Sequence, residues 1–256
     1  MYIVFTTKRK LITIIALVVI LIIATSIIGI GYVSAFGNNQ KRQLPIYYVQ
    51  TERKVVSISF DCAWGTDYTD KLLEVMAKHN VKSTFFAVEF WAKKNAKYLK
   101  KISEMGHEIG THSSTHPYMS KLSRENVIKE LSSSREVIES IIEKKINLFR
   151  PPYGDYNDQL ITTAKELGLY TIQWDVDSLD WKNLSSNDIK NRVVSRVRNG
   201  SIVLFHNQGL HTHEALDGII KELKSKNYEF LPIGQMIYKT DYEMQIDGGQ
   251  KKITNN

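Results

Sequence analysis

Residues 201–206 read SIVLFH, and this short stretch decides the fold class. Residues 202–205 are all apolar, which is typical of a parallel strand that is buried on both faces. Further runs rich in β-branched and aromatic residues recur along the chain, at residues 55–63, 83–88, 108–113, 148–152, 170–176 and 228–232. Amphipathic helical patterns separate these runs, so the sequence predicts seven consecutive βα units.

Seven βα units with short connections predict an α/β protein with a parallel sheet. The sheet is either open and doubly wound or closed into a barrel. Gly106 and Gly168 each follow an apolar helical pattern directly, as glycines do where helices end. In a barrel the active site lies at the carboxyl ends of the strands, so the residues at those ends are the first functional candidates.

The composition excludes several classes of protein. The chain has 256 residues, of which 43% are hydrophobic, so it is long enough for a globular domain with a sizeable core. Cys62 is the single cysteine, which excludes an intramolecular disulfide and a zinc site made of several cysteines. The net charge of +7 is not gathered with aromatic residues into one basic patch, so we expect no nucleic-acid partner.

The N-terminus contains an uncharged run, residues 11–31, that directly follows Lys8, Arg9 and Lys10. At about 1.5 Å per residue this run is long enough to span a hydrocarbon core of roughly 30 Å. We therefore expect a cytoplasmic basic flank at 1–10 and a single-pass transmembrane anchor at 11–31, with the rest of the chain outside the cytoplasm. The alternative is a signal peptide cleaved after residues 33–35, which would make the protein secreted.

The remaining chain divides into three parts by composition. Residues 37–53 are polar and contain glycine and proline, so we interpret them as a linker. Residues 54–239 contain all seven βα units and form one domain. Residues 240–256 are polar and contain Gly248 and Gly249, which predicts a disordered tail.

Polar and charged residues follow five of the seven predicted strands. They are Asp61, His112 with His116, Arg150, Asp177 with Asp180, and His206. Because the carboxyl ends of parallel strands lie at the same edge of a sheet, these side chains are expected to lie close together. Chance placement would not group these residues at one edge in this way.

The spacing of His112 and His116, four residues apart, is one that brings two imidazoles to one metal ion. Two ordinary polar loop histidines are the alternative. Zinc is the first expectation for the metal, because imidazole suits it. A carboxylate at Asp61, near a dication and Arg150, would stay ionised at neutral pH and accept a proton from water.

Two aromatic residues, Tyr153 and Trp181, lie in the same predicted rim. Each is either an ordinary apolar rim residue or a platform on which a sugar ring stacks. The latter interpretation would give the site a glycan-binding surface.

Five segments of the chain resemble the five motifs of the polysaccharide deacetylases, the NodB homology group known as carbohydrate esterase family 4. They are SFD at 59–61, GHEIGTHSSTHP at 106–117, RPPYG at 150–154, DSLDW at 177–181 and LFH at 204–206. The resemblance covers about residues 54–238, with the motifs in the family's order. It implies a deformed (β/α) barrel of about seven parallel strands. It also implies a metal-dependent hydrolase that removes acetyl groups from a cell-wall glycan such as peptidoglycan.

The resemblance also implies roles for five residues. Asp61 matches the general base, and Arg150 matches the residue that orients it. His206 matches the general acid, with Asp180 as its partner. Tyr153 matches a residue whose backbone N–H helps to bind the oxyanion.

His112 and His116 match two metal ligands of the family, but the third ligand departs from the pattern. Where the family has a second aspartate that binds the metal, this chain has Cys62. Three interpretations stay open: Cys62 binds zinc, Cys62 is a bystander beside a two-histidine site, or the site is impaired. The last would leave a membrane-anchored glycan-binding protein. The chain also resembles the membrane-anchored, sporulation-associated subgroup, in which this aspartate is likewise replaced.

Overall fold

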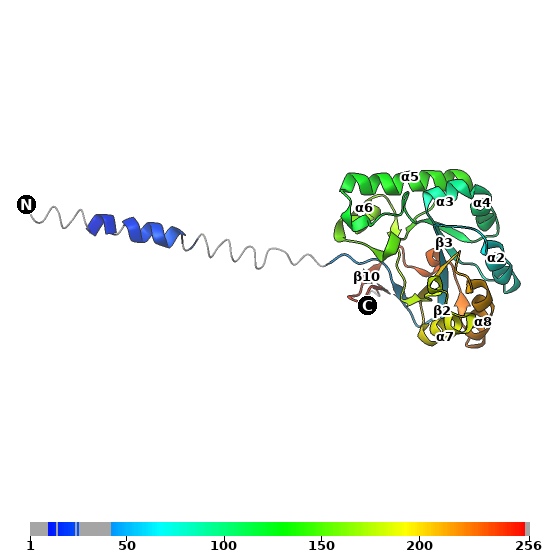
Figure 1. Ribbon diagram of the computed structural model, residues 1–256. Coiled ribbons are helices and arrows are strands. Elements are labelled where there is room, and N and C mark those ends of the chain that lie inside the picture. The colour runs from blue at the N-terminus through cyan, green and yellow to red at the C-terminus, as the bar shows by residue number, and fades with distance from the viewer. Residues whose placement is uncertain (1–9, 14, 24, 26–41, 254–256) are drawn as a thin grey trace, which may run out of the picture. The chain divides into compact units, whose positions relative to one another are not determined.

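The structure is a computed structural model that describes residues 10–13, 15–23, 25 and 42–253. The chain divides into two units, Met1–Arg42 and Gln43–Asn256, which we describe separately. In the first unit residues 10–13, 15–23 and 25 are helical (Figure 1). Among the described residues, none of the helices combines the length and the hydropathy that crossing a membrane requires. The predicted anchor, 11–31, lies partly outside these residues.

The second unit alternates strands with helices, as the sequence predicts. Its strands are β1 (Tyr48–Gln50), β2 (Val55–Cys62), β3 (Thr84–Ala87), β4 (Glu108–Thr111), β5 (Leu148–Phe149), β6 (Tyr170–Thr171), β7 (Val176–Asp177), β8 (Ser201–His206), β9 (Glu229–Phe230), β10 (Tyr242–Met244) and β11 (Gly249–Lys252). Its helices are α2 (Thr69–Lys78), α3 (Glu89–Lys94), α4 (Ala96–Glu104), α5 (Arg124–Ile142), α6 (Asp158–Glu166), α7 (Ser186–Arg196), α8 (Thr212–Ser225) and α9 (Ile233–Met236).

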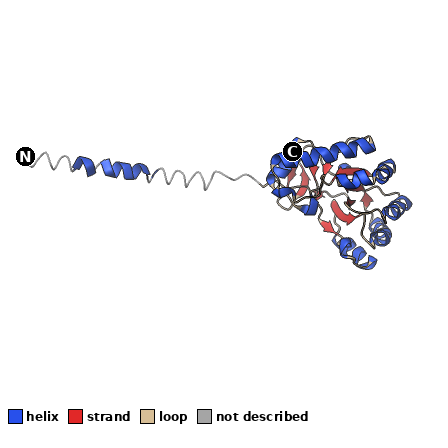
Figure 2. Cartoon of the chain, turned by 45° about the horizontal axis from the view of Figure 1, so that its top comes forward, coloured by secondary structure: helices blue, strands red, loops and turns tan. Residues whose placement is uncertain are grey.

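The parallel strands form a curved half-barrel, consistent with the expected deformed barrel, and helices lie outside the strands (Figure 2). Pairing runs from β2 through β3, β4 and β5 to β6, and β8 pairs with β2 on the other side. β7 pairs in parallel with β8. The segment 170–177 contains both β6 and β7, so it connects the two ends of this row of paired strands. The predicted strand at 170–176 is thus divided between two neighbours.

The N-terminal segment fills the gap between β6 and β8. Ile46 forms a parallel bridge with Ile172, and Tyr48 pairs in antiparallel register with Ser201. The Ile46 N–H donates to the Thr171 carbonyl at 2.9 Å. The prediction that residues 37–53 form a linker is therefore wrong for residues 46–50. A strand of three residues is too short for its periodicity to be visible in the sequence.

The prediction of a disordered tail at 240–256 is wrong for residues 242–252. These residues form an antiparallel hairpin, β10–β11, whose second strand pairs in parallel with β1. The turn contains Gly248 at φ +82°, a left-handed conformation that glycine adopts without strain. Asp247 accepts a hydrogen bond from the Tyr48 hydroxyl at 2.7 Å. The hairpin is held by backbone pairing, and its polar side chains give no apolar signal.

The alternation of side chains along β2 directs two kinds of residue to opposite faces. Ile58, Phe60 and Cys62 belong to the apolar cluster against which the outer helices pack. Phe60 stacks on Phe85 with ring centroids 4.9 Å apart. Asp61 is on the other face, which is the barrel interior, because strand side chains alternate with a period of two. β2 therefore builds the core with one face and the site with the other.

Candidate active site

Asp61 and Arg150 form a buried ion pair inside the barrel. Arg150 follows β5 and is fully buried, and its Nη1 donates to Asp61 Oδ1 at 2.9 Å. Its Nη2 donates to the Ser59 hydroxyl at 2.8 Å and to the Gln173 carbonyl at 3.2 Å. The guanidinium also lies 4.2 Å from the ring centre of Phe86. These contacts fix the guanidinium, which in turn fixes the carboxylate.

The charge state of Asp61 follows from two opposing effects. Burial raises the pKa of the carboxyl, but electrostatic interactions with His112, Arg150 and His206 outweigh burial and hold the pKa below its ordinary value. Asp61 is therefore an ionised carboxylate at neutral pH, as a general base must be.

The two predicted metal ligands lie side by side after β4. The rings of His112 and His116 have centroids 4.9 Å apart. His112 Nδ1 lies 2.7 Å from the Arg150 carbonyl, which can only accept, so Nδ1 carries the proton and Nε2 is left with a lone pair. That Nε2 lies 3.4 Å from Asp61 Oδ2. His116 Nδ1 is buried and has no hydrogen-bond partner among the described residues.

Both imidazoles are neutral at pH 7, which is the form that binds metals. Burial, together with the electrostatic influence of the neighbouring His112, lowers the pKa of His116 to about 4. Burial also lowers the pKa of His112, although Asp61 opposes the shift. Neutral imidazoles are donors of the kind that a divalent cation binds in proteins, and the site offers two of them.

The loop between the two histidines is held by Glu130 of α5. The Glu130 carboxylate accepts hydrogen bonds from the backbone N–H groups of Ser114 at 2.9 Å and Thr115 at 2.8 Å, and from the Thr115 hydroxyl at 2.7 Å. Ser113 and His116 both have positive φ values, +72° and +60°, which are strained for residues with a side chain. Sequence reasoning missed Glu130, because a glutamate on an amphipathic helix has no distinguishing pattern.

His206, at the end of β8, pairs with the buried Asp180. His206 Nδ1 lies 2.8 Å from Asp180 Oδ1, and the other carboxylate oxygen accepts from the His206 N–H and from the Thr212 hydroxyl. Burial disfavours the imidazolium, but the hydrogen bond and charge of Asp180 prevail and raise the pKa of His206. His206 is directly opposite Asp61 in the β2–β8 register. The site thus has a proton acceptor and a proton donor on neighbouring strands.

One pocket of about 610 Å³ at the carboxyl ends of the strands brings these groups together. Its lining includes Asp61, Trp64, His112, His116, Tyr153, Trp174, Trp181 and His206. Arg150 and Asp180 lie behind it, where each holds a lining residue. Tyr153 and Trp181 are both more than half exposed. Trp64 and Trp174 are lining residues that the sequence did not single out.

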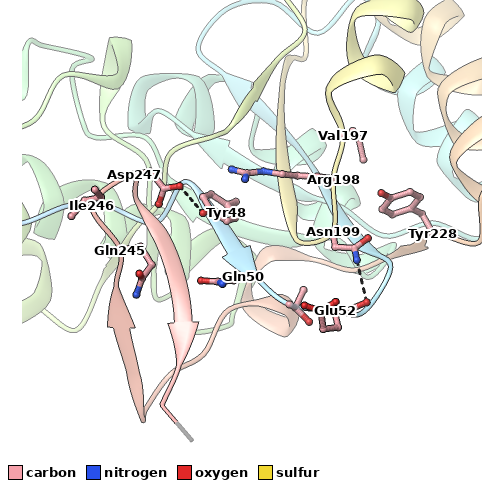
Figure 3. Close-up of a pocket in the computed structure, with 11 residues that line it drawn as sticks. Tyr48, Gln50, Glu52, Val197, Arg198, Asn199, Tyr228, Gln245, Ile246 and Asp247 are labelled. Carbon is pink, nitrogen blue, oxygen red and sulfur yellow. Dashed lines mark hydrogen bonds between the residues drawn. The ribbon is translucent and has the colours of Figure 1, made fainter.

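A second hollow of about 700 Å³ lies between β1, the β10–β11 hairpin and the loop before β8 (Figure 3). Its lining includes Tyr48, Arg198 and Asp247, but none of the predicted site residues. Although this hollow is larger, its lining has no proton acceptor and proton donor like Asp61 and His206 in the pocket at the carboxyl ends of the strands. The chemistry therefore belongs to the rim pocket.

Cys62 lies away from this pocket. Its side chain is fully buried in the apolar cluster, and it is not among the residues that line the pocket. Burial, reinforced by the charge of Asp61, raises the pKa of the thiol well above its ordinary value, so the thiolate that zinc binds is disfavoured. Among the described residues, no three or more His, Cys, Asp or Glu side chains are grouped so that they could hold a metal. The geometry favours the interpretation in which Cys62 is a bystander.

The first prediction concerns this thiol. Cys62→Ala is expected to leave the zinc dissociation constant within about threefold of the parent value, because the removed sulfur does not face the pocket. The measurement is competition with a chromogenic chelator. A loss of affinity above about tenfold would show that Cys62 is a ligand after all.

Comparison with known proteins agrees with the geometry of the rim. Residues 48–172 match the polysaccharide deacetylase family. A peptidoglycan-N-acetylglucosamine deacetylase of Bacillus cereus is 33% identical over 194 residues, which are 74% of this chain and 91% of that enzyme. The chain belongs to the polysaccharide deacetylase family. As a polysaccharide deacetylase it is of the hydrolase class that acts on non-peptide carbon–nitrogen bonds, and its predicted family membership is confirmed.

Two other similar proteins bear on this polysaccharide deacetylase. The uncharacterized protein YlxY of Bacillus subtilis is 35% identical over 196 residues. These residues are 77% of this chain and 61% of the length of YlxY. The solved structure of a carbohydrate esterase family 4 pseudoenzyme from Bacillus anthracis has a TM-score of 0.73 and 32% identity, and covers 82% of this chain and 73% of that one. Proteins similar to this chain thus include one that is named as a deacetylase and one that is described as a pseudoenzyme.

Proposed function

We propose that this protein removes N-acetyl groups from cell-wall peptidoglycan or a related glycan. The reaction would use one divalent metal ion, for which zinc is the first candidate. One observation carries the proposal. The Asp61–Arg150 and His206–Asp180 pairs meet at one pocket, next to two neutral imidazoles. The named activity of the Bacillus cereus relative supports the choice of substrate.

The residues divide the reaction between them. Asp61 takes a proton from the attacking water, and Arg150 keeps the carboxylate oriented for that transfer. When held by His112 and His116, a divalent ion supplies positive charge that polarises the acetyl carbonyl and acidifies water. The backbone N–H of Tyr153 is proposed to donate to the carbonyl oxygen as negative charge develops there.

The leaving amine needs a proton as the carbon–nitrogen bond breaks. His206 is the group that donates it, because its raised pKa favours the imidazolium before the transfer. Asp180 stabilises that imidazolium and fixes the ring. Trp181 is proposed to stack against the sugar that carries the acetyl group.

A second candidate function is that of a catalytically impaired, membrane-anchored glycan-binding protein. Two observations favour it: Cys62 stands where the family has a metal-binding aspartate, and the thiol lies away from the pocket. The similarity to a pseudoenzyme points the same way.

The intact ion pairs of the site, Asp61 with Arg150 and Asp180 with His206, favour the enzyme. A role in spore formation rests only on the resemblance to the sporulation-associated subgroup.

The appearance of free amines tests the proposed function. Purified, N-acetylated peptidoglycan is incubated with the zinc-loaded protein and then treated with an amine-reactive dye. New labelled glucosamine or muramic acid after digestion supports N-deacetylation. A digest without new amines excludes N-deacetylation of that wall polymer.

The proposed metal site predicts a large effect on zinc binding. His112→Ala/His116→Ala is expected to weaken zinc binding by more than about 100-fold, because both imidazole donors are removed. The dissociation constant is measured by isothermal titration calorimetry. His211→Ala/His213→Ala removes two histidines at the start of α8 that do not line the pocket, and it is the matched control. Equal zinc affinity in the two double variants would refute the metal site.

We also propose that the deacetylase domain lies outside the cytoplasmic membrane. The support is the basic residues 8–10 followed by the uncharged run 11–31. An alkaline phosphatase fused after Asn256 is expected to be active, because this reporter folds only when it is exported. A fluorescent protein that matures only in the cytoplasm is the complementary fusion, and fluorescence there would refute the orientation.

A further inference from the structure

Trp64 is an exposed tryptophan at the mouth of the active-site pocket. It follows β2 and lines the same pocket as Asp61 and His116, yet 62% of its surface is exposed. Its indole ring meets the His116 ring edge-on, with centroids 5.3 Å apart. Together with Tyr153 and Trp181 it makes a group of exposed aromatic side chains that line one pocket, and such a group is a sign of a binding surface.

The backbone that carries Trp64 is held firmly although the indole is largely exposed. The Asn207 side-chain amide donates to the carbonyls of Trp64 at 3.3 Å and Gly65 at 2.9 Å. The buried Trp91 indole also donates to the Gly65 carbonyl, at 2.7 Å. These contacts order the loop before any ligand arrives, so less entropy is lost when a ligand binds to the indole.

The barrel topology places Trp64 and Trp181 on opposite sides of His206. β8, which ends in His206, pairs with β2 on one edge and with β7 on the other. Trp64 follows β2 and Trp181 follows β7, and 55% of the surface of Trp181 is exposed. Neighbouring strands lie about 4.8 Å apart, so the two loops leave the barrel about two strand spacings from each other. A single pyranose ring is too small to cover both indoles.

We propose that Trp64 and Trp181 bind different sugar rings of one glycan chain, which crosses the pocket over His206. The apolar C–H face of a pyranose packs on an aromatic ring, and two such contacts on either side of the reacting centre require an oligomer. Trp64 is then the residue that makes the protein prefer polymeric glycan to a single sugar. This inference rests on the proposed function for its choice of a glycan.

Calorimetric titration with oligomers of β-1,4-linked N-acetylglucosamine tests this assignment. All variants are made in a zinc-loaded Asp61→Asn background, so that turnover does not disturb binding. Affinity is expected to rise with oligomer length when Trp64 is present. Trp64→Ala is expected to weaken binding of the longest oligomer by about 3- to 10-fold, and to leave binding of the single sugar unchanged. Trp64→Phe keeps a ring and is expected to retain most of the affinity.

The matched control is Phe90→Ala, which removes an exposed aromatic residue that does not line the pocket. Equal affinity of Trp64→Ala and its background for the longest oligomer would overturn the proposal. So would an equal loss for single sugar and oligomer. Because the readout is binding, a protein that binds oligomers through Trp64 but releases no acetate would support this inference and refute only the enzyme.

Discussion

Asp61→Asn is expected to reduce acetate release by about 10²- to 10⁴-fold, the usual contribution of a general base. The amide oxygen still accepts a hydrogen bond from Arg150, so the geometry of the pocket is kept. The amide nitrogen, however, has no lone pair with which to take a proton from water. Rates are measured at saturating zinc with circular dichroism as the check on folding.

Asp67→Asn is the matched control for this variant. Asp67 is an exposed aspartate in the same loop after β2, and it contacts the Gln208 side chain rather than the ion pair. Its replacement is expected to leave the rate within about twofold of the parent, because surface substitutions away from a site change little. A similar rate for the two variants would remove Asp61 from the role of base.

Arg150→Met is expected to lower the free energy of unfolding by about 3–5 kcal/mol. The change leaves the Asp61 carboxylate buried without its cation, and removes the donor to the Ser59 hydroxyl and the Gln173 carbonyl. Urea denaturation followed by fluorescence measures the effect. Arg150→Met/Asp61→Asn is expected to be less destabilised than the sum of the single variants, because the uncompensated charge is gone.

Arg124→Met is the control for this prediction. Arg124 pairs with Glu166, but both side chains are more than half exposed. Loss of such a surface pair is expected to cost at most about 1 kcal/mol. If Arg150→Met costs as little as Arg124→Met, the buried pair does not hold the barrel interior together.

The central strands were predictable because their periodicity reflects burial. SIVLFH at 201–206 forms β8, and each predicted strand appears near its expected place. The helical pattern between the predicted strands at 83–88 and 108–113 forms two helices, α3 and α4, because Asn95 leaves the helical conformation and its side chain donates to the Trp91 carbonyl. The β10–β11 hairpin was missed, since backbone pairing with β1 needs no apolar pattern.

The site was predictable where one residue carries the chemistry, and not where a distant residue supports it. Strand ends indicated Asp61 and His206, whereas Glu130 lies on a helix and bonds the histidine loop only in the folded protein. The orientation of Cys62 was present in the sequence. In SISFDC, Ser59 and Asp61 alternate with Phe60 and Cys62, so the period of two already places the thiol on the apolar face.

Acetate release from N-acetylated peptidoglycan by the zinc-saturated parent protein tests most directly whether the rim is a working hydrolytic centre. The released acetate is quantified enzymatically, with the Asp61→Asn protein as the blank. Turnover by the parent is expected, with a reduction of about 10²-fold or more in the Asp61→Asn protein. Equal, background-level release by both proteins would contradict this expectation and leave the glycan-binding function in place of the enzyme.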